Sequence, residues 1–358
     1  MTGKTATFLT LLTAVAPAVP AAAQWLPQRS GTTAELRALV AVSARVAWAG
    51  GKGGVFTRTV DGGASWRADT VPGATGLFFI GVAAVDADTA WLAGTSFADS
   101  IPDARVYRTV DGGRSWTLQW RSTRPGIFLD GIRCWDTRRA VAFGDALDGR
   151  LLLLVTADGG ASWRTPASAP PALAGEAGFA ASGTALAVIG GAASRGRAWV
   201  GTGGGARARV YRTEDGGWSW LAAATPLPAG RTSGIFGVAF GDAEHGVAVG
   251  GEYTHPRAAS GSNVVSTSDG GRTWRVMGEA KPAGVRYGVA WAHGTGPAVV
   301  AVGPSGSGYS IDGGRTWTPV DTVAYNTVAF AGGAAGWAAG PHGRIARWIG
   351  SFRGRPSR

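Results

Sequence analysis

Three side chains of this sequence have the types that acid–base chemistry on a sugar requires. Asp130 and Glu176 are carboxylates and Tyr287 is a phenol, and each stands one or two residues before a recurring small residue. Paired carboxyl groups at a fixed separation hydrolyse glycosidic bonds by acid–base or nucleophilic catalysis. Asp145 and Glu252 form a second possible pair. The sequence therefore leaves open a glycoside hydrolase that uses Asp130, Glu176 and Tyr287.

The same small residues mark a ring of polar and aromatic side chains that suits binding without catalysis. The candidate binding residues are Arg37, Asp130, Glu176, Glu252, Tyr253, Arg286, Tyr287, Tyr325 and Asn326. A concave site with a few convergent polar groups is the usual form of a binding pocket. The formal net charge is +11, and such an excess favours anionic partners. We expect an anionic protein complex or a glycan as the partner.

Other chemistries lack the residues they need. The glycine-rich run Gly201–Ala206 precedes a strand-like segment, whereas a dinucleotide site needs a helix there. The histidines show no metal-ligand spacing; they are His245, His255, His293 and His342. One cysteine, Cys134, cannot form an internal disulfide. We expect no cofactor, no metal and no nucleic-acid partner, with an oxidoreductase as a remote alternative.

These side chains must be positioned by a repeated element, because one eight-residue phrase occurs six times. The phrase reads Ser/Thr, any residue, Asp, Gly, Gly, any residue, Ser/Thr, Trp, and we call it the box. The boxes are Thr59–Trp66, Thr109–Trp116, Thr156–Trp163, Thr213–Trp220, Thr267–Trp274 and Ser310–Trp317. Successive boxes are separated by 50, 47, 57, 54 and 43 residues. A period of this length indicates a stacked or radial repeat.

The box has a structural explanation in all six copies. The Gly-Gly pair permits a tight turn at positive φ, and the carboxylate accepts hydrogen bonds from nearby amides. The closing Trp is large enough to wedge between neighbouring sheets. We therefore interpret the six box aspartates as scaffold; they are Asp61, Asp111, Asp158, Asp215, Asp269 and Asp312.

The box resembles the Asp-box, or BNR repeat, of sialidases and of the photosystem II stability/assembly factor family. The resemblance covers nearly the whole chain after its first residues and implies a β-propeller. Likeness to the assembly factors implies an exported, non-catalytic binding or assembly protein. Likeness to sialidases implies a glycoside hydrolase instead, but the Phe-Arg-Ile-Pro phrase of those enzymes is missing. A shared box does not decide between these functions.

The spacing predicts an all-β chain, a seven-bladed β-propeller of four-stranded antiparallel blades. Small residues mark the innermost strands; they are Ala38, Gly81, Gly131, Gly178, Gly237, Gly288 and Thr327. The seventh unit, which starts at Tyr325, has no box. Trp25 precedes the first inner strand much as a box Trp precedes the next one. We expect the N-terminal strand to close the last blade, which removes free sheet edges.

Three segments are expected along the chain. Residues 1–23 have the basic start, apolar stretch and small-residue end of a signal peptide. Residues 24–350 form the propeller, and residues 351–358 are a basic C-terminal tail. No other long apolar run suggests a transmembrane anchor. The protein is therefore expected to be exported, to the periplasm or the exterior.

Overall fold

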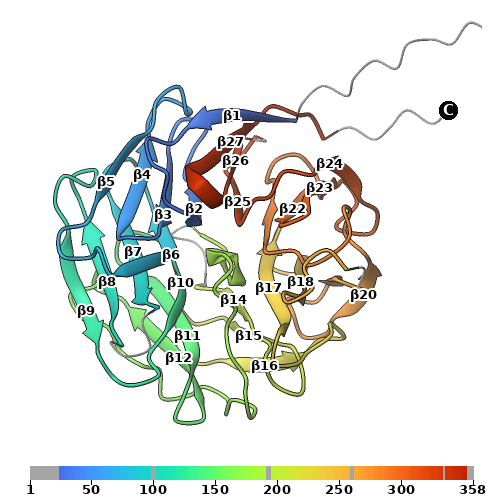
Figure 1. Ribbon diagram of the computed structural model, residues 1–358. Coiled ribbons are helices and arrows are strands. Elements are labelled where there is room, and N and C mark those ends of the chain that lie inside the picture. The colour runs from blue at the N-terminus through green and yellow to red at the C-terminus, as the bar shows by residue number, and fades with distance from the viewer. Residues whose placement is uncertain (1–23, 98–101, 191–194, 259–261, 334, 353–358) are drawn as a thin grey trace, which may run out of the picture.

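Seven antiparallel sheets form a ring around a common axis in the computed structural model of this chain (Figure 1). The structure describes residues 24–97, 102–190, 195–258, 262–333 and 335–352. The expected signal peptide and most of the basic tail lie outside these residues. Within them no helix has both the length and the apolarity needed to cross a membrane. The predicted seven-bladed propeller is confirmed.

The first three blades follow one another along the chain. Blade 1 contains β2 (Leu36–Ala41), β3 (Ala47–Gly51), β4 (Val55–Thr59) and β5 (Arg67–Thr70). Blade 2 contains β6 (Leu77–Ala84), β7 (Ala90–Ser96), β8 (Ala104–Thr109) and β9 (Thr117–Ser122). Blade 3 contains β10 (Leu129–Cys134), β11 (Ala140–Leu147) and β12 (Arg150–Thr156). Two isolated antiparallel bridges, from Val155 to Arg164 and from Arg150 to Pro171, take the place of its fourth strand.

The remaining blades complete the ring. Blade 4 contains β13 (Leu186–Val188), β14 (Ala198–Gly201), β15 (Arg209–Thr213) and β16 (Leu221–Ala224). Blade 5 contains β17 (Ser233–Phe240), β18 (Gly246–Glu252), β19 (Val264–Thr267) and β20 (Arg275–Gly278). Blade 6 contains β21 (Gly288–Trp291), β22 (Val299–Gly303), β23 (Gly306–Ser310) and β24 (Thr318–Asp321). Blade 7 combines β25 (Thr327–Phe330), β26 (Gly336–Ala339), β27 (Arg344–Trp348) and β1 (Trp25–Arg29).

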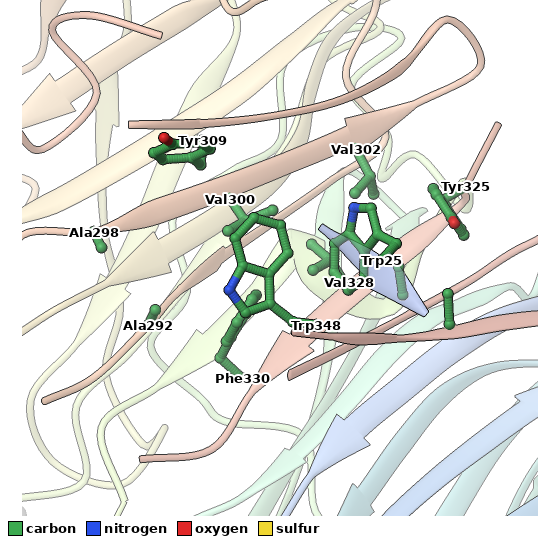
Figure 2. Packing of buried hydrophobic residues seen from close by; sticks show 12 residues of the cluster. Trp25, Ala292, Ala298, Val300, Val302, Tyr309, Tyr325, Val328, Phe330 and Trp348 are labelled. Carbon is green, nitrogen blue, oxygen red and sulfur yellow. The ribbon is translucent and has the colours of Figure 1, made fainter. Parts of the chain in front are cut away.

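The N-terminal strand closes the ring, as the sequence predicts. β1 pairs antiparallel with β27, so that Trp25 lies opposite Trp348; the blue and red ends of the chain meet there in Figure 1. The Trp25 ring packs between blades 6 and 7 against Trp348, at a centroid distance of 4.9 Å (Figure 2). Its indole Nε1 donates to Ser307 Oγ over 2.9 Å. Trp25 thus fills the place of the missing seventh box Trp.

All six boxes form the same turn. In the first, Thr59 Oγ1 donates to Asp61 Oδ1 over 2.8 Å and accepts from Gly63 N over 2.8 Å. Ser65 N donates to the same carboxylate over 2.9 Å. Both glycines of every box have φ between 71° and 94°, a region that other residues adopt at a cost. The aspartates thus accept from their own turn, as a scaffold role requires.

The boxes and the predicted binding ring lie on opposite faces of the ring of blades. Strand direction alternates within a blade, so the third-to-fourth strand turns share a face with the first-to-second strand loops. Gly62 N of the first box accordingly donates to Arg45 O of such a loop over 2.9 Å. The opposite face, which we call the mouth face, carries the second-to-third strand loops and the starts of the inner strands.

A short segment of blade 4 plugs the central tunnel. The turn η1 (Gly183–Ala185) contacts the inner strands of all six other blades, namely β2, β6, β10, β17, β21 and β25; it is the short green coil near the middle of Figure 1. Gly183 is needed there, because a Cβ would stand 2.6 Å from Ile80 O. The prediction that Gly178 marks the fourth inner strand is wrong. That strand is β13, and residues 178–185 form the plug instead.

Candidate functional site

An aromatic hollow of about 480 Å³ opens on the mouth face above the plug. Its aromatic walls are Phe97, Phe128, Phe179, Phe236, Tyr253 and Tyr287, and its charged groups are Arg37, Asp130, Asp145 and Arg231. The plug residues Ala180 and Ala181 form part of its floor. Because the floor is closed, the hollow is a pocket rather than the entrance to a channel.

β-Bulges aim several of these side chains into the hollow. The pairing of inner and second strands slips by one residue at the same place in four blades, which leaves Arg37, Ile80, Asp130 and Phe236 outside the ladder. A bulge bends the strand and redirects the extra side chain. A further bulge in β11 does the same for Asp145. Blade 3 therefore presents two carboxyl groups from adjacent strands.

Asp130 and Asp145 stand on adjacent strands at the wall of the hollow. Asp130 is 1% exposed, and no donor other than the neighbouring Asp145 carboxyl reaches it among the described residues. Burial, followed by the charge of Asp145, raises the pKa of Asp130 well above its ordinary value. Asp145 accepts from Gly178 N over 2.8 Å. Burial and the neighbouring carboxyl group both favour the protonated form of Asp130.

The aromatic rings form a continuous stack across the other wall. Phe236 lies between Phe179 and Tyr287, with ring centroids 4.4 and 5.6 Å away and nearly parallel planes. Tyr253 is 42% exposed at the rim and meets Phe179 edge-on. Burial raises the pKa of Tyr287, so its hydroxyl stays neutral at physiological pH. These rings offer flat apolar surface with one polar end.

Arg37 supplies a guanidinium at the rim. Its Nη1 donates to Ala180 O of the plug over 3.0 Å, and its Nε donates to Glu35 Oε1 over 2.9 Å. The guanidinium carbon lies 4.9 Å from the Phe78 ring centroid. Arg37 is only partly buried, so it is held in place and still faces the hollow.

Glu176 is placed away from the hollow, inside blade 4. Its carboxylate is buried and accepts from Arg209 Nε over 3.0 Å, Thr202 Oγ1 over 2.6 Å and Leu173 N over 2.8 Å. Tyr211 also donates to it, over 3.2 Å. With its oxygens engaged in this way, Glu176 fastens the blade. The structure does not bring it together with Asp130 as a catalytic pair.

Arg286 is also removed from the predicted ring, because it is fully buried. Its guanidinium donates to Gly306 O over 2.9 Å and Ala283 O over 2.7 Å. Burial lowers the pKa of Arg286 to about 10. The group therefore holds two mouth-face loops together and is not exposed to a ligand.

The last three predicted residues also have structural partners. Tyr325 packs on Trp25 at a centroid distance of 5.7 Å between blades 6 and 7. Asn326 Nδ2 donates to Leu36 O over 3.0 Å and ties blade 7 to blade 1. Glu252 accepts from Thr232 Oγ1 over 2.7 Å and from Thr254 N over 2.8 Å at the end of β18. The hollow thus contains Arg37, Asp130, Tyr253 and Tyr287 from the predicted set.

Sequence reasoning missed half of the hollow. Phe97, Phe128 and Arg231 stand in loops whose path depends on the blade geometry. Asp145 was paired with Glu252 rather than with Asp130. The acidic residue just after the second-strand Gly144 is the one sequence signal that could have indicated the pair. In the described ranges no three His, Cys, Asp or Glu side chains cluster to hold a metal.

Comparison with known proteins identifies the architecture. No family model matches the chain, and no curated protein matches it. The solved structure "YCF48 bound to D1 peptide" is 17% identical, with a TM-score of 0.65 over 95% of this chain and 99% of that chain. YCF48 from Cyanidioschyzon merolae is 18% identical, with a TM-score of 0.62 over 91% and 99%.

A glycoside hydrolase shares the fold as well. The GH74 xyloglucanase from Xanthomonas campestris is 20% identical, with a TM-score of 0.64 over 92% of this chain but only 55% of that one. The matches to YCF48 thus cover 91–95% of this chain and 99% of those chains, whereas the match to the xyloglucanase covers about half of the enzyme. At these identities the likeness is one of fold: this chain is a seven-bladed β-propeller similar to YCF48 and to GH74 propellers.

Proposed function

We propose that this chain is an exported, non-catalytic propeller that binds a protein partner through the aromatic hollow and serves the assembly of an envelope complex. The observation that carries the proposal is the hollow itself, a closed pocket of stacked rings and charged rim groups. Its volume of about 480 Å³ is in the range of pockets that bury a few side chains. An extended peptide segment with an aromatic residue and an acidic residue fits its rings and Arg37.

The fold likeness supports a peptide as the occupant. One YCF48 structure is described as bound to a D1 peptide, and that propeller matches this chain over nearly all of both lengths. The basic character of the chain and the rim groups Arg37 and Arg231 favour an anionic segment. Export to the periplasm or the exterior rests on the leader-like residues 1–23.

The carboxyl groups of the hollow do not have the arrangement of a glycosidase. Retaining enzymes separate their two carboxyl groups by about 5 Å, and inverting enzymes by more. Asp130 and Asp145 instead stand on adjacent strands of one blade, and burial raises the pKa of Asp130. Glu176, the other candidate acid, is neutralised by Arg209. The proposed role is therefore binding.

Site-specific crosslinking tests the proposal. A photoreactive phenylalanine analogue replaces Tyr253 at the hollow and, as a matched control, Val110 on the box face, which is 62% exposed. After illumination with the native envelope fraction, mass spectrometry should find one partner segment on the Tyr253 derivative alone. Equal labelling at both positions would contradict a site at the hollow. If the chain hydrolyses a fluorogenic glycoside and Asp145→Asn abolishes this activity, the proposed binding role is wrong and the chain is a hydrolase.

A further inference from the structure

Four blades share a cross-strand pair that locks each blade to the next, and we call it the Trp–Arg latch. Its pairs are Trp48 with Arg58, Trp91 with Arg108, Trp199 with Arg212 and Trp337 with Arg347. In three pairs the guanidinium carbon lies over the indole, 4.9 to 5.7 Å from the ring centroid. A cation over an aromatic face is attracted by its quadrupole.

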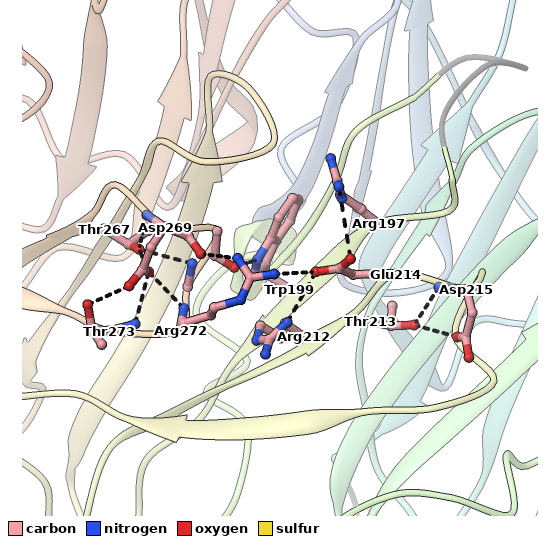
Figure 3. A network of polar contacts seen from close by, with 12 residues as sticks. Arg197, Trp199, Arg212, Thr213, Glu214, Asp215, Thr267, Asp269, Arg272 and Thr273 are labelled. Atoms are coloured by element: carbon pink, nitrogen blue, oxygen red, sulfur yellow. Dashed lines mark hydrogen bonds and ion pairs between the residues drawn. The ribbon is translucent and has the colours of Figure 1, made fainter.

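In three of the four blades the latch donates to the box of the following blade. Arg347 Nη1 reaches Gly62 O over 2.8 Å, and Arg108 Nη1 reaches Gly159 O over 3.0 Å. In blade 4 the indole itself donates, from Trp199 Nε1 to Gly270 O over 2.8 Å, while Arg212 joins the Glu214 ion-pair network (Figure 3). In these three latches the acceptor is the carbonyl of the first box glycine, whereas in blade 1 Arg58 donates to Ala87 O and Trp48 Nε1 donates to Asp86 O over 3.2 Å.

Blade 5 lacks both members of the latch. Val247 and Ser266 face each other in the same register, and neither fills the volume of an indole or a guanidinium. A cavity of about 600 Å³ lies there between blades 5 and 6, lined by Ser266 and Met277 on one side and Trp291 on the other. Gly313, the first glycine of the sixth box, also lines it. The latch acceptor is present while the latch is missing.

The two other interfaces without a latch are filled by different aromatic residues. Val141 and Val155 face each other in blade 3, and Trp135 and Trp220 pack into the same cluster as Val141. In blade 6, Val300 faces Tyr309, against which Trp348 and Phe352 pack at about 6 Å. Trp291 and Trp317 pack against the cluster that contains Val247 at the interface of blades 5 and 6, yet the cavity of about 600 Å³ remains beside Ser266.

We propose that this cavity is a second binding site, which takes a planar cation joined to an aromatic ring. The ring occupies the space of the missing indole, and the cation donates to Gly313 O as the latch arginines donate to Gly62 and Gly159. The carboxylates of Asp242 and Asp312 also line the cavity and favour a positive charge. Arg275 and Arg315 stand at its exposed rim, so an anionic ring compound is the competing occupant.

Met277 provides a local reporter of binding. The chain has two methionines, Met1 and Met277, so methyl-labelled protein gives one signal from the cavity and one from the first residue. Three probes are titrated: phenylguanidinium, N-acetyl-Trp-Arg-amide and benzoate. We expect a saturable shift of the Met277 methyl with both cations, and binding of benzoate at least about tenfold weaker. Tighter binding of the dipeptide amide would identify a peptide, rather than a small molecule, as the source of the cation.

A variant that rebuilds the latch tests the location. Val247→Trp combined with Ser266→Arg should fill the cavity, raise the Tm and weaken phenylguanidinium binding by at least about tenfold. Ser266→Arg alone supplies the guanidinium and should also weaken binding if the double variant does not fold. Val110→Trp, on the surface of another box, is the matched control and should bind as the unaltered chain does. Tighter binding of benzoate, no Met277 shift at about 10 mM cation, or unchanged affinity in both latch variants would overturn the proposal.

Discussion

Burial, followed by the charge of Asp145, raises the pKa of Asp130, so this carboxyl group favours its protonated form in the folded chain. The folded chain therefore binds a proton that the unfolded chain releases once the pH exceeds the ordinary aspartate range. A raised pKa in the folded state means that Asp130 is least unfavourable to stability below the ordinary aspartate pKa. Stability then falls as the pH rises from the ordinary pKa towards the folded one.

Asp130→Asn should remove this dependence. The amide keeps a donor for Asp145 and has no proton to lose, so the free energy of unfolding should no longer decline between pH 5 and pH 8. Each unit by which the pKa of Asp130 is raised corresponds to about 1.4 kcal/mol. Urea denaturation of both proteins at the two pH values measures the effect. Parallel losses in the unaltered chain and the variant would show that Asp130 is not the group responsible.

Variants of Arg37 and Arg286 should differ in their effects, because we expect Arg37 to contribute to binding and Arg286 to contribute to stability. Arg286 is buried, and its guanidinium donates to Gly306 O, Ala283 O and Ser305 Oγ; hydrogen bonds to a charged group each contribute about 1.5–3 kcal/mol. We expect Arg286→Ala to lower the free energy of unfolding by about 2–4 kcal/mol. Arg37→Ala should change stability little and weaken capture of an anionic partner. Denaturation and pull-down of both variants from the envelope fraction give the comparison, and a binding loss confined to Arg286→Ala would contradict the placement.

At the scale of the element, the box turn makes the stability of the fold depend on pH. Hydrogen bonds from the serine hydroxyl, then from the serine amide, hold the pKa of Asp61, Asp111 and Asp158 well below its usual range. A lowered pKa in the folded state contributes stability that is present above the ordinary aspartate pKa. That contribution is lost as the pH falls through the folded pKa.

The acid sensitivity of the propeller should therefore depend on the box serines. Replacing Ser65, Ser115 and Ser162 by alanine removes the largest cause of the lowered pKa in three boxes. Thermal unfolding between pH 7 and pH 3 should show a smaller drop in Tm for the triple variant than for the unaltered chain, together with a lower Tm at pH 7. An identical drop would mean that these turns do not govern acid unfolding.

Elements that repeat could be predicted from the sequence, and elements that break the repeat could not. The box spacing and the recurring small residues of the inner strands predict the order of the blades. The position of Trp25 before the first inner strand predicts that it replaces the missing seventh box Trp. The plug escaped detection because Gly178 fits the small-residue column as well as a true inner-strand residue does. The plug lies within the longest box interval, the 57 residues from Asp158 to Asp215.

Only part of the lining of the hollow could be predicted from the sequence. A bulge changes where Asp130 and Asp145 point without leaving a composition signal, and Glu176 and Arg286 look like site residues until their partners are known. Burial decides these cases, and burial depends on neighbours from other blades. Sequence position alone predicts that a residue lies near the mouth face, but not whether its side chain faces solvent.

At the scale of the whole molecule, the ring depends on contacts between the two ends of the described chain. β1 pairs with β27 along its full length, and Trp25 is 4% exposed among residues of blades 6 and 7 (Figure 2). The other wedges are each held within a blade by their own box. Trp25 depends on the pairing of a strand with another that is about 320 residues away in sequence, so closure is the most non-local step of folding.

Trp25→Ala should consequently destabilise the entire ring rather than one blade. Loss of a buried Trp costs about 3–5 kcal/mol, and the open edge of β27 would then be free to pair with other chains. Trp66→Ala, which removes a box wedge while leaving β1 in place, is the matched control. Chemical denaturation should give losses of similar size, but only Trp25→Ala should raise the rate of hydrogen exchange in β27 and promote concentration-dependent association. If both variants show the same hydrogen exchange in β27 and the same association, then Trp25 contributes no more than a box Trp does. Closure by the N-terminal strand would then not be the step on which the ring depends.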